Sequence, residues 1–320
     1  MTHLFYLAEL PFEIIHCNFQ LRGSESDADA KFVEELAQSL RVAYKIKSFD
    51  TKKYELEQGV STQMAARELR YAWFDSLLSD APEGRIAIAH HKGDVAETMI
   101  YNLTKGSGLA GLHGIRPISA NGIIRPMLFA NRDELEKYAR SEGLTWREDS
   151  SNASDVYSRN HIRLNVIPEL QKLNPAVIET MVSTARIFNE AEKIISEQVK
   201  QSRATICQEK QNSLWIDRLK LKQTPSPEYF LFEFLKIYGF NSSQVYNINT
   251  TDQTGAIFET DDYSLNIDRD FIIVSPKDSE RVELGIDEST ESTVINGWRF
   301  NFCALNDFAL GTISNNTAIL

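Results

Sequence analysis

The sequence predicts an α/β protein: a parallel sheet covered by helices, followed by a helical connector and a small α+β module. Over about the first 125 residues, short apolar runs alternate with amphipathic helical stretches, which is the pattern of βα repeats. Residues 175–201 form a long amphipathic stretch that suits a connector. Beyond it, short alternating runs separated by polar turns are typical of an antiparallel sheet. We therefore expect two domains, residues 1–200 and residues 201–320, with a boundary near residues 201–206.

The individual elements follow from hydrophobic periodicity. Strands are expected where apolar residues run together, and helices where apolar residues recur on one face. The chain opens with a predicted helix, and no strand comes before it. Because a doubly wound sheet normally begins with a strand that feeds its first helix, we expect this sheet to be truncated at its first strand. The expected strands are residues 14–17, 43–46, 86–89 and 123–124 in the first part and 256–258, 264–267 and 271–275 in the second; the expected helices are residues 2–10, 27–40, 62–77, 133–142 and 228–238.

The charge is unevenly distributed along the chain. A net charge of −11 argues against a nucleic-acid-binding surface spread over the whole protein, because such surfaces neutralise phosphates with Lys and Arg. Residues 241–320 hold 13 acidic and 4 basic residues, a net charge of −9, whereas residues 101–175 hold 10 basic and 8 acidic residues. Any basic surface is therefore expected in the middle of the chain.

Cysteine usage and hydropathy bear on the compartment. Cys17, Cys207 and Cys303 are far apart and odd in number, so neither a disulfide framework nor a CxxC site is predicted. No apolar stretch reaches the roughly 18 residues that a membrane span requires, and the residues after Met1 lack a signal-peptide pattern. We expect a cytoplasmic protein with no membrane partner.

The most informative residues follow the predicted strand at residues 86–89. His90 and His91 come at its carboxyl end, where open α/β sheets bind their ligands. Asp94 and Glu97 share a face of the next helix because they are three residues apart. Two such carboxylates can hold an ammonium group or a divalent cation; the alternative is an acidic helix start that complements the dipole. Zinc is not expected, because the HExxH pairing is missing.

Several basic residues are candidate phosphate contacts. Lys105 lies in a glycine-rich turn that could approach phosphate, and Arg159 and Arg163 form a basic spot suited to phosphate oxygens. Arg22 lies in a loop that enters a helix, and Arg67 lies on the helix before the histidine strand. The alternatives are an ordinary loop, an interdomain salt-bridge patch and a solvated helix face.

Four sequence blocks, in order, resemble tRNA(Ile)-lysidine synthetase. They are HCNFQLRGSESDAD from His16, AARELRY from Ala65, HHKGDVAETMIYNLTKGSGLAGL from His90 and REDSSNASDVYSRNHIR from Arg147. The resemblance covers roughly residues 1–175, and YFLFEFLKIYGFNSSQV from Tyr229 resembles the family's small C-terminal module. It implies an adenine-nucleotide-hydrolase-like, Rossmann-like sheet of the PP-loop ATP-pyrophosphatase superfamily.

The resemblance also implies a reaction. The family adenylates the C2 oxygen of the wobble cytidine in an isoleucine tRNA with a CAU anticodon, using ATP and Mg²⁺, and free L-lysine then displaces AMP to give lysidine. Carried over to this chain, Asp94 and Glu97 would recognise the lysine. The resemblance further assigns Arg67 and His90 to the catalytic site, His16 and Asn18 to the adenosine, and Arg22, Lys105, Arg159 and Arg163 to the tRNA.

Two departures from the family pattern shape these expectations. Gly93 stands where family members often carry an acid. The SGGxDS loop that should cradle pyrophosphate would have to precede Met1, and a further C-terminal domain would have to follow Leu320. We therefore expect the 320-residue chain to be a fragment with negligible ATP-driven lysine transfer. The alternatives are a tRNA thiolase of the same superfamily and a non-catalytic RNA-binding homologue. The protein could also assemble as a homodimer.

Overall fold

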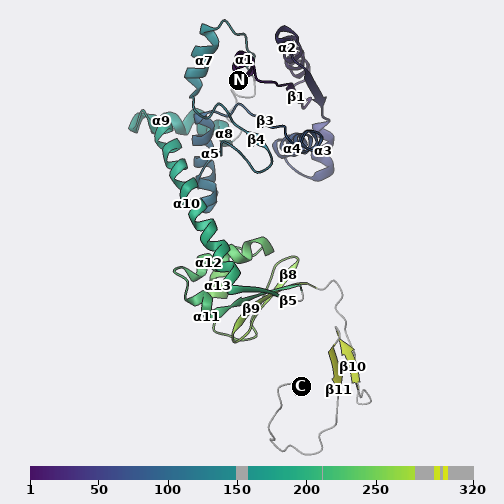
Figure 1. Ribbon diagram of the computed structural model, residues 1–320, viewed down its shortest axis with the longest axis vertical. Coiled ribbons are helices and arrows are strands. Elements are labelled where there is room, and N and C mark those ends of the chain that lie inside the picture. Colours follow the sequence, from purple (N-terminus) through teal and green to yellow (C-terminus); the bar gives the residue numbers. More distant parts are fainter. Residues whose placement is uncertain (149–157, 211, 278–291, 296–297, 302–320) are drawn as a thin grey trace, which may run out of the picture. The chain divides into compact units, whose positions relative to one another are not determined.

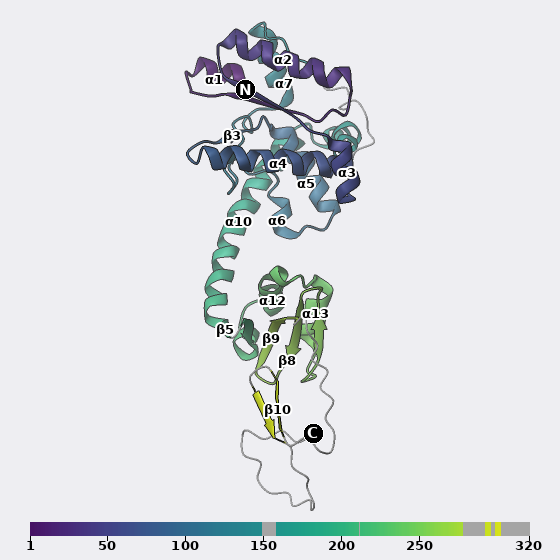
Figure 2. The ribbon, with the colours of Figure 1, turned by 90° about the vertical axis from the view of Figure 1, so that its right-hand side faces the viewer.

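The chain divides into two compact units in the computed structural model, residues 1–200 and residues 201–320. The structure describes residues 1–148, 158–210, 212–277, 292–295 and 298–301. Figures 1 and 2 show the helices and strands of each unit from two directions. None of the helices in the described ranges has both the length and the apolar character needed to cross a membrane.

The first unit contains two parallel strand pairs connected by helices, and each pair is a separate two-stranded sheet. The sequence predicts the parallel pairing, but as one continuous sheet. Strand β1 pairs with β2 so that His16 lies opposite Ile46, and β3 pairs with β4 so that Ile86 lies opposite Ile123. The elements are α1 (Thr2–Leu7), β1 (Ile14–Asn18), α2 (Ser24–Leu40), β2 (Tyr44–Ser48), α3 (Thr51–Gln58), α4 (Thr62–Asp80), β3 (Ile86–Ala87), α5 (Lys92–Thr104), α6 (Gly108–Leu112), β4 (Ile123–Ile124), α7 (Arg132–Ser141), α8 (Ser158–His161), the π-helical turn η2 (Ile162–Val166), α9 (Ile167–Leu173) and α10 (Val177–Ile206).

Three apolar clusters hold the first unit together. Phe74 of α4 packs with Ile86 and Ile123 of the β3–β4 pair, and side chains of β1 join this cluster, so it links the two strand pairs. Helix α5 is packed on two sides: Val95 lies in a cluster with α10, and Ala96 lies in a cluster with η2 and α9. Both small side chains of α5 are buried, which fixes the helix in position and orientation.

The second unit is an antiparallel sheet with helices. Its sheet runs in the order β5-β6-β9-β8-β7. Helix α12 carries an apolar run, and its side chains Leu231, Phe234 and Leu235 are fully buried. The elements are β5 (Cys207–Lys210), β6 (Ser213–Asp217), α11 (Arg218–Lys222), α12 (Pro227–Leu235), the 3₁₀ turn η3 (Lys236–Tyr238), α13 (Ser242–Thr250), β7 (Ile257–Glu259), β8 (Tyr263–Ile267), β9 (Phe271–Pro276), β10 (Ser292–Ile295) and β11 (Trp298–Asn301).

The structure corrects several predicted element bounds. The strand predicted at residues 86–89 is shorter, because only Ile86 and Ala87 pair with β4. The helix predicted at residues 228–238 ends at Leu235 and continues as a 3₁₀ turn that stops at Gly239, whose φ of 84° is easily adopted only by glycine. The helix predicted at residues 2–10 ends at Leu7. Cys303 and residues 149–157 of the fourth sequence block lie outside the described residues.

Candidate functional site

The site begins at the N-terminus of α5, directly after β3. The Nδ1 atom of His91 accepts a hydrogen bond from the backbone N–H of Gly93 (3.0 Å), and Asp94 accepts one from the backbone N–H of His91 (2.8 Å). This reciprocal capping box satisfies two amide groups that the first helical turn leaves without partners. The His91 Nε2 atom also lies 3.3 Å from the Asp94 Oδ2 atom. Asp94 therefore has a structural role in addition to any ligand contact.

Gly93 is required by the position of the His91 ring. A Cβ atom added at residue 93 would lie 2.7 Å from the His91 Cε1 atom, which is closer than real Cβ contacts come. Any side chain at this position would push the imidazole away from the helix start. The glycine that departs from the resembled family's pattern is therefore matched to the imidazole conformation found here.

Glu97 is the most unusual charged group of the site. Only 6% of its surface is exposed. Burial, followed by the nearby negative charge of Asp94, raises the pKa of Glu97 to about 7, although the charges of Arg163, Arg159 and Arg132 oppose this shift. A carboxyl with a pKa near neutrality exchanges its proton readily and gains ionic character when a cation approaches. Asp94, the other member of the predicted pair, is thus close enough to influence the protonation of Glu97.

His90 lies beside this pair and is neutral at pH 7. Its Nδ1 atom accepts a hydrogen bond from the Arg125 Nε atom at 3.2 Å. Burial lowers the pKa of His90, and the charge of Arg125 adds to this effect while that of Asp94 opposes it. Because the Arg125 bond requires an unprotonated Nδ1 atom, the proton of the neutral ring is on Nε2.

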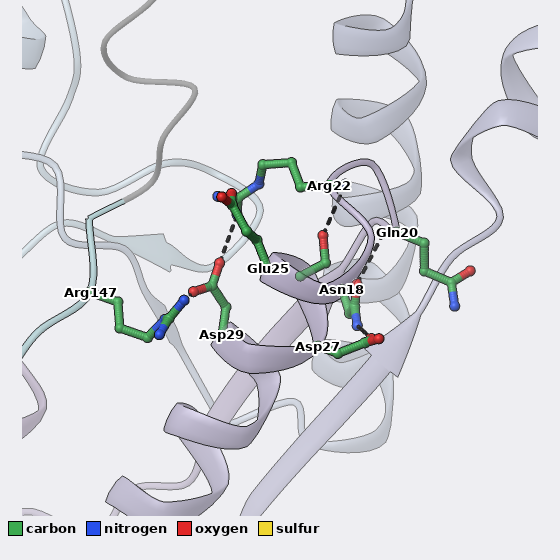
Figure 3. A network of polar contacts seen from close by, with 8 residues as sticks. Asn18, Gln20, Arg22, Glu25, Asp27, Asp29 and Arg147 are labelled. Atoms are coloured by element: carbon green, nitrogen blue, oxygen red, sulfur yellow. Dashed lines mark hydrogen bonds and ion pairs between the residues drawn. The ribbon is translucent and has the colours of Figure 1, made fainter.

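A second polar network follows β1 and is drawn in Figure 3. Asn18 is 5% exposed; its Oδ1 atom accepts from the Gln20 backbone N–H (3.0 Å) and its Nδ2 atom donates to the Asp27 Oδ1 atom (3.3 Å). Burial lowers the pKa of the neighbouring His16. The charge of Asp29 opposes this shift, and the charge of Arg22 adds to it. The predicted adenosine residues therefore lie at the start of this network, and Asn18 uses both ends of its amide to hold the loop.

The same network joins two distant arginines through one carboxylate. Asp29 accepts from the Arg22 guanidinium at 2.7 Å and from the Arg147 Nε atom at 2.5 Å (Figure 3). Burial alone would raise the pKa of Asp29, but the hydrogen bonds and charges of Arg147 and Arg22 together hold it below its ordinary value. Sequence reasoning missed Asp29 and Arg147 as site residues because they are 118 positions apart.

Helix α4 presents arginines supported by aromatic rings. The Arg67 guanidinium lies over the Tyr71 ring at 4.6 Å, and Arg70 lies over the Phe19 ring at 5.2 Å. Within the described residues, Arg67 makes no ion pair with Asp94 or Glu97. Its side chain is exposed, which agrees with the alternative of a solvated helix face, and its catalytic role stays a prediction.

Three of the four residues predicted for tRNA contact gather near α5. Lys105 and Arg159 both lie over the ring of Tyr101, at 5.5 and 5.9 Å from its centre. Arg163 donates to the Asn160 side chain at 3.0 Å. Because Arg159 and Arg163 also act on the pKa of Glu97, this basic surface adjoins the carboxylate pair. Arg22 lies in the separate β1 network.

No metal centre is formed by protein groups alone in the part of the chain that the structure describes. None of its groups of three or more His, Cys, Asp or Glu residues is arranged to hold a metal ion. A cavity of about 770 Å³ is lined mainly by residues 113–118 and by α10, and its apolar lining includes Val95, Leu128 and Val182. Neither Asp94 nor Glu97 lines it, so it is separate from the carboxylate pair.

Comparison with known proteins decides the family. A family model described as the PP-loop domain matches residues 2–170, and one described as the TilS substrate binding domain matches residues 209–277. The chain belongs to the tRNA(Ile)-lysidine synthase family of PP-loop proteins. The resemblance drawn from the four sequence blocks is therefore confirmed, and so is the α/β fold class.

Three relatives show the extent of the similarity. The chain is 38% identical over 277 residues to the tRNA(Ile)-lysidine synthase of Bacteroides thetaiotaomicron, covering 86% of this chain and 64% of that one. It is 38% identical over 274 residues to that of Porphyromonas gingivalis, covering 84% and 60%, and 39% identical over 272 residues to that of Parabacteroides distasonis, covering 83% and 60%. The chain thus spans less than two thirds of the length of these relatives.

A solved structure of the U34-tRNA thiolase NcsA from Methanococcus maripaludis, with its [4Fe-4S] cluster, is a more distant match. It has 17% sequence identity and a TM-score of 0.49, covering 59% of this chain and 68% of that one. This likeness favours neither a ligase nor a thiolase.

Proposed function

We propose that this protein acts in ATP-dependent tRNA modification, joining L-lysine to C2 of the wobble cytidine in an isoleucine tRNA with a CAU anticodon. The observation that carries the proposal is the buried carboxylate Glu97 beside Asp94 at the start of α5, in a chain that matches tRNA(Ile)-lysidine synthases over most of its length. In this proposal the protein works in the cytoplasm. Residues 1–200 carry the chemistry, and residues 201–320 contribute to tRNA binding.

The carboxylate pair suits recognition of the lysine ammonium. An ammonium group that enters a buried site needs a compensating negative charge and hydrogen-bond acceptors. Glu97 supplies the charge when it ionises, and Asp94 supplies a second carboxylate one helical turn away. The surrounding Arg132, Arg159 and Arg163 keep the ionised form of Glu97 accessible near neutral pH.

The proposed reaction breaks one carbon–oxygen bond and forms one carbon–nitrogen bond. ATP converts the C2 oxygen of cytidine into an adenylate with release of pyrophosphate. An unprotonated amine of lysine then attacks C2, and AMP leaves with the oxygen. Ionised Glu97, whose pKa is about 7, is suited to take the first proton from the bound ammonium, which frees the amine for attack. After the attack the nitrogen loses a second proton to water.

ATP and Mg²⁺ are the proposed co-reactants. His16 and Asn18, at the carboxyl end of β1, are the residues proposed to lie near the adenosine, because ligands of parallel α/β sheets bind at that edge. The described residues form no three-ligand group for a metal. They do not fit Mg²⁺ on their own.

The proposed tRNA contacts are basic residues near the carboxylate pair. Lys105 and Arg159 flank Tyr101 and Arg163 lies next to them, while Arg22 lies at the β1 network. Guanidinium groups bind phosphate oxygens with two parallel hydrogen bonds. An RNA strand over Lys105 and Arg159 would pass close to Glu97. Arg67 and His90 complete the proposed catalytic set.

The cysteines argue against the thiolase alternative. Burial raises the pKa of Cys17, and it raises the pKa of Cys207 to about 11. Thiols with raised pKa values are poor nucleophiles near pH 7, since the thiolate is the reactive form. The two cysteines also belong to different units of the chain. Neither therefore has the character of a sulfur-transfer residue.

The test is lysine incorporation into tRNA. We would express the protein from its natural reading frame, with any residues that precede Met1 or follow Leu320, and supply unmodified isoleucine tRNA, ATP and radiolabelled lysine. We expect ATP-dependent label in the tRNA, lost in Asp94→Asn and Glu97→Gln and kept in Asp75→Asn, a matched change at an exposed site on α4. Sulfur incorporation instead of lysine, or tRNA binding with no incorporation, would overturn the proposal.

A further inference from the structure

A second cavity, of about 370 Å³, lies beside the start of α5. One side of it is a face of α7, another is the segment that follows α7, and His91 at the start of α5 also lines it. It is lined by His91, Arg132, Leu135, Glu136, Ala139, Trp146, Arg147 and Glu148. Neither Asp94 nor Glu97 is among these residues, so the cavity adjoins the candidate active site without coinciding with it.

The walls of the cavity combine a flat aromatic surface with charge. Trp146 is 43% exposed, an unusually open position for an indole beside the apolar side chains of Leu135 and Ala139. Two acids also line the cavity: Glu136 pairs with Arg132 at 2.8 Å and with Arg140 at 3.2 Å, and Glu148 lies 3.9 Å from Arg132. The cavity therefore combines an exposed indole with two guanidinium groups, and the two acids lie close to only one of these, that of Arg132.

Arg147 is held in place at this rim. Its Nε atom donates to Asp29, which also binds Arg22 (Figure 3), while 42% of the Arg147 side chain is exposed. A guanidinium whose orientation is fixed by one carboxylate loses less entropy when it binds a second anion. Asp29 is thus a positioning residue for Arg147.

The cavity is also connected to the chemistry of α5. His91 lines it and at the same time caps α5 through Gly93 and lies 3.3 Å from Asp94. Arg132 lines it and also acts on the charge of Glu97. A ligand in the cavity would therefore sit next to the carboxylate pair.

We propose that this cavity binds one nucleotide of single-stranded RNA, a neighbour of the reacting cytidine, with its base stacked on Trp146 and its phosphate on Arg147. The inference rests on the proposed function for the identity of the RNA. Proteins that bind unpaired RNA stack its bases on aromatic rings and hold its phosphates with arginine. An indole beside a preoriented guanidinium is this combination, and a sugar or an aliphatic ligand would use only part of it.

The experiment measures binding of an unlabelled anticodon stem-loop RNA to the 320-residue chain by tryptophan fluorescence, and binding of a dye-labelled copy by polarisation. The chain holds four tryptophans, so Trp146→Phe isolates the signal of Trp146 while keeping an aromatic ring. We expect RNA to quench wild-type fluorescence and not that of the phenylalanine variant, whose affinity stays within about threefold. Trp146→Ala should weaken binding by about tenfold or more, the range found for loss of one stacked base.

Arg147→Ala and Asp29→Asn test the phosphate contact. We expect Arg147→Ala to weaken binding and to lower the salt dependence by about one counterion, with a smaller loss for Asp29→Asn. Lys137→Ala is the matched control, because Lys137 is exposed on the same α7 helix and does not line the cavity. Its loss of RNA affinity should be smaller than that of Arg147→Ala and measures the effect of removing one positive charge from this surface.

Three results would overturn the inference: RNA that binds folded Trp146→Ala as tightly as wild type, RNA that leaves Trp146 fluorescence unchanged, or free ATP that quenches Trp146 when RNA does not. The last result would assign the cavity to the nucleotide co-substrate. Failure of lysine incorporation with Trp146 quenching intact would instead reject the proposed function and leave the RNA subsite standing.

Discussion

Two carboxylates of the first unit, Glu97 on α5 and Asp29 on α2, lie in opposite environments. Asp29 is bound by two guanidinium groups, which hold its pKa below the ordinary value. Glu97 is buried beside Asp94, and these two influences raise its pKa to about 7. A carboxylate whose charge is already compensated supports structure, whereas one whose charge is left uncompensated is available to a ligand. The contrast separates the positioning network of β1 from the candidate catalytic pair.

The largest effect is expected for lysine transfer by Glu97→Gln. Removing the charge that would hold the lysine ammonium should lower kcat/KM for lysine by about 100-fold, since a buried charge-assisted contact is worth roughly 2–3 kcal/mol. The measurement is steady-state lysine incorporation at pH 7.5 with saturating tRNA and ATP. A change below threefold would place lysine elsewhere, and Asp75→Asn reports any general effect of losing a carboxylate.

The same substitution should stabilise the fold at alkaline pH. The raised pKa of Glu97 means that the folded state binds more protons than the unfolded state between about pH 4.5 and pH 7, so stability falls as pH rises through this window. Glu97→Gln removes this cost and should add about 2 kcal/mol at pH 8 and little at pH 4.5. Urea unfolding at both pH values measures the difference. A variant that is less stable at pH 8 would show that Glu97 is an ordinary structural carboxylate.

Asp29→Asn should change the stability of the fold in the opposite direction from Glu97→Gln. The lowered pKa of Asp29 contributes stability that is present above about pH 4 and is lost as pH falls through the folded-state value. We expect a loss of about 1–2 kcal/mol that is constant from pH 6 to pH 9, because two charge-assisted hydrogen bonds are weakened. Chemical unfolding over that range provides the test. A loss that varied between pH 6 and pH 9 would mean that another group titrates with the network.

The smallest effect concerns the start of α5. Gly93→Ala would place its Cβ atom 2.7 Å from the His91 ring, displacing the imidazole from the cap and costing about 1 kcal/mol. His91→Asn keeps a side chain that caps helices well and should change stability by less than about 0.5 kcal/mol. Thermal unfolding of the two variants compares them. Because alanine is favoured over glycine in a helix by about 1 kcal/mol, a Gly93→Ala variant stabilised by that full amount would show that the His91 cap contributes nothing.

Local pattern was enough to predict most of the fold and the closeness of Asp94 and Glu97, whose roles stay predictions. Strand-end position and the three-residue spacing of Asp94 and Glu97 indicated the pair, since both depend only on neighbouring residues. The convergence of Arg132, Arg159 and Arg163 on Glu97 could not be predicted, because three separate elements bring these side chains together. The Asp29 contact with Arg147 has the same cause.

Some elements carried too little apolar pattern to be found. Helix α3, with sequence TKKYELEQ, has no continuous apolar face and depends on its cap, in which Asp50 accepts from the Lys53 backbone N–H. Strand β5, with sequence CQEK, is an edge strand whose last three residues are exposed. Edge strands pair on one side only and need no alternation of apolar residues, so sequence periodicity does not reveal them.

The proton linkage of lysine binding tests the central claim most directly, namely that Glu97, a buried carboxylate with no direct ion pair to another described residue, recognises an ammonium group. Calorimetric titration of lysine into the protein at pH 6 and pH 8 would measure it, with Glu97→Gln as the reference. Because a pKa of about 7 leaves most of Glu97 protonated at pH 6 and ionised at pH 8, affinity should rise by about tenfold between the two, with proton release at the lower pH and no rise in the variant. Equal affinity at both pH values, with no proton released, would contradict the account.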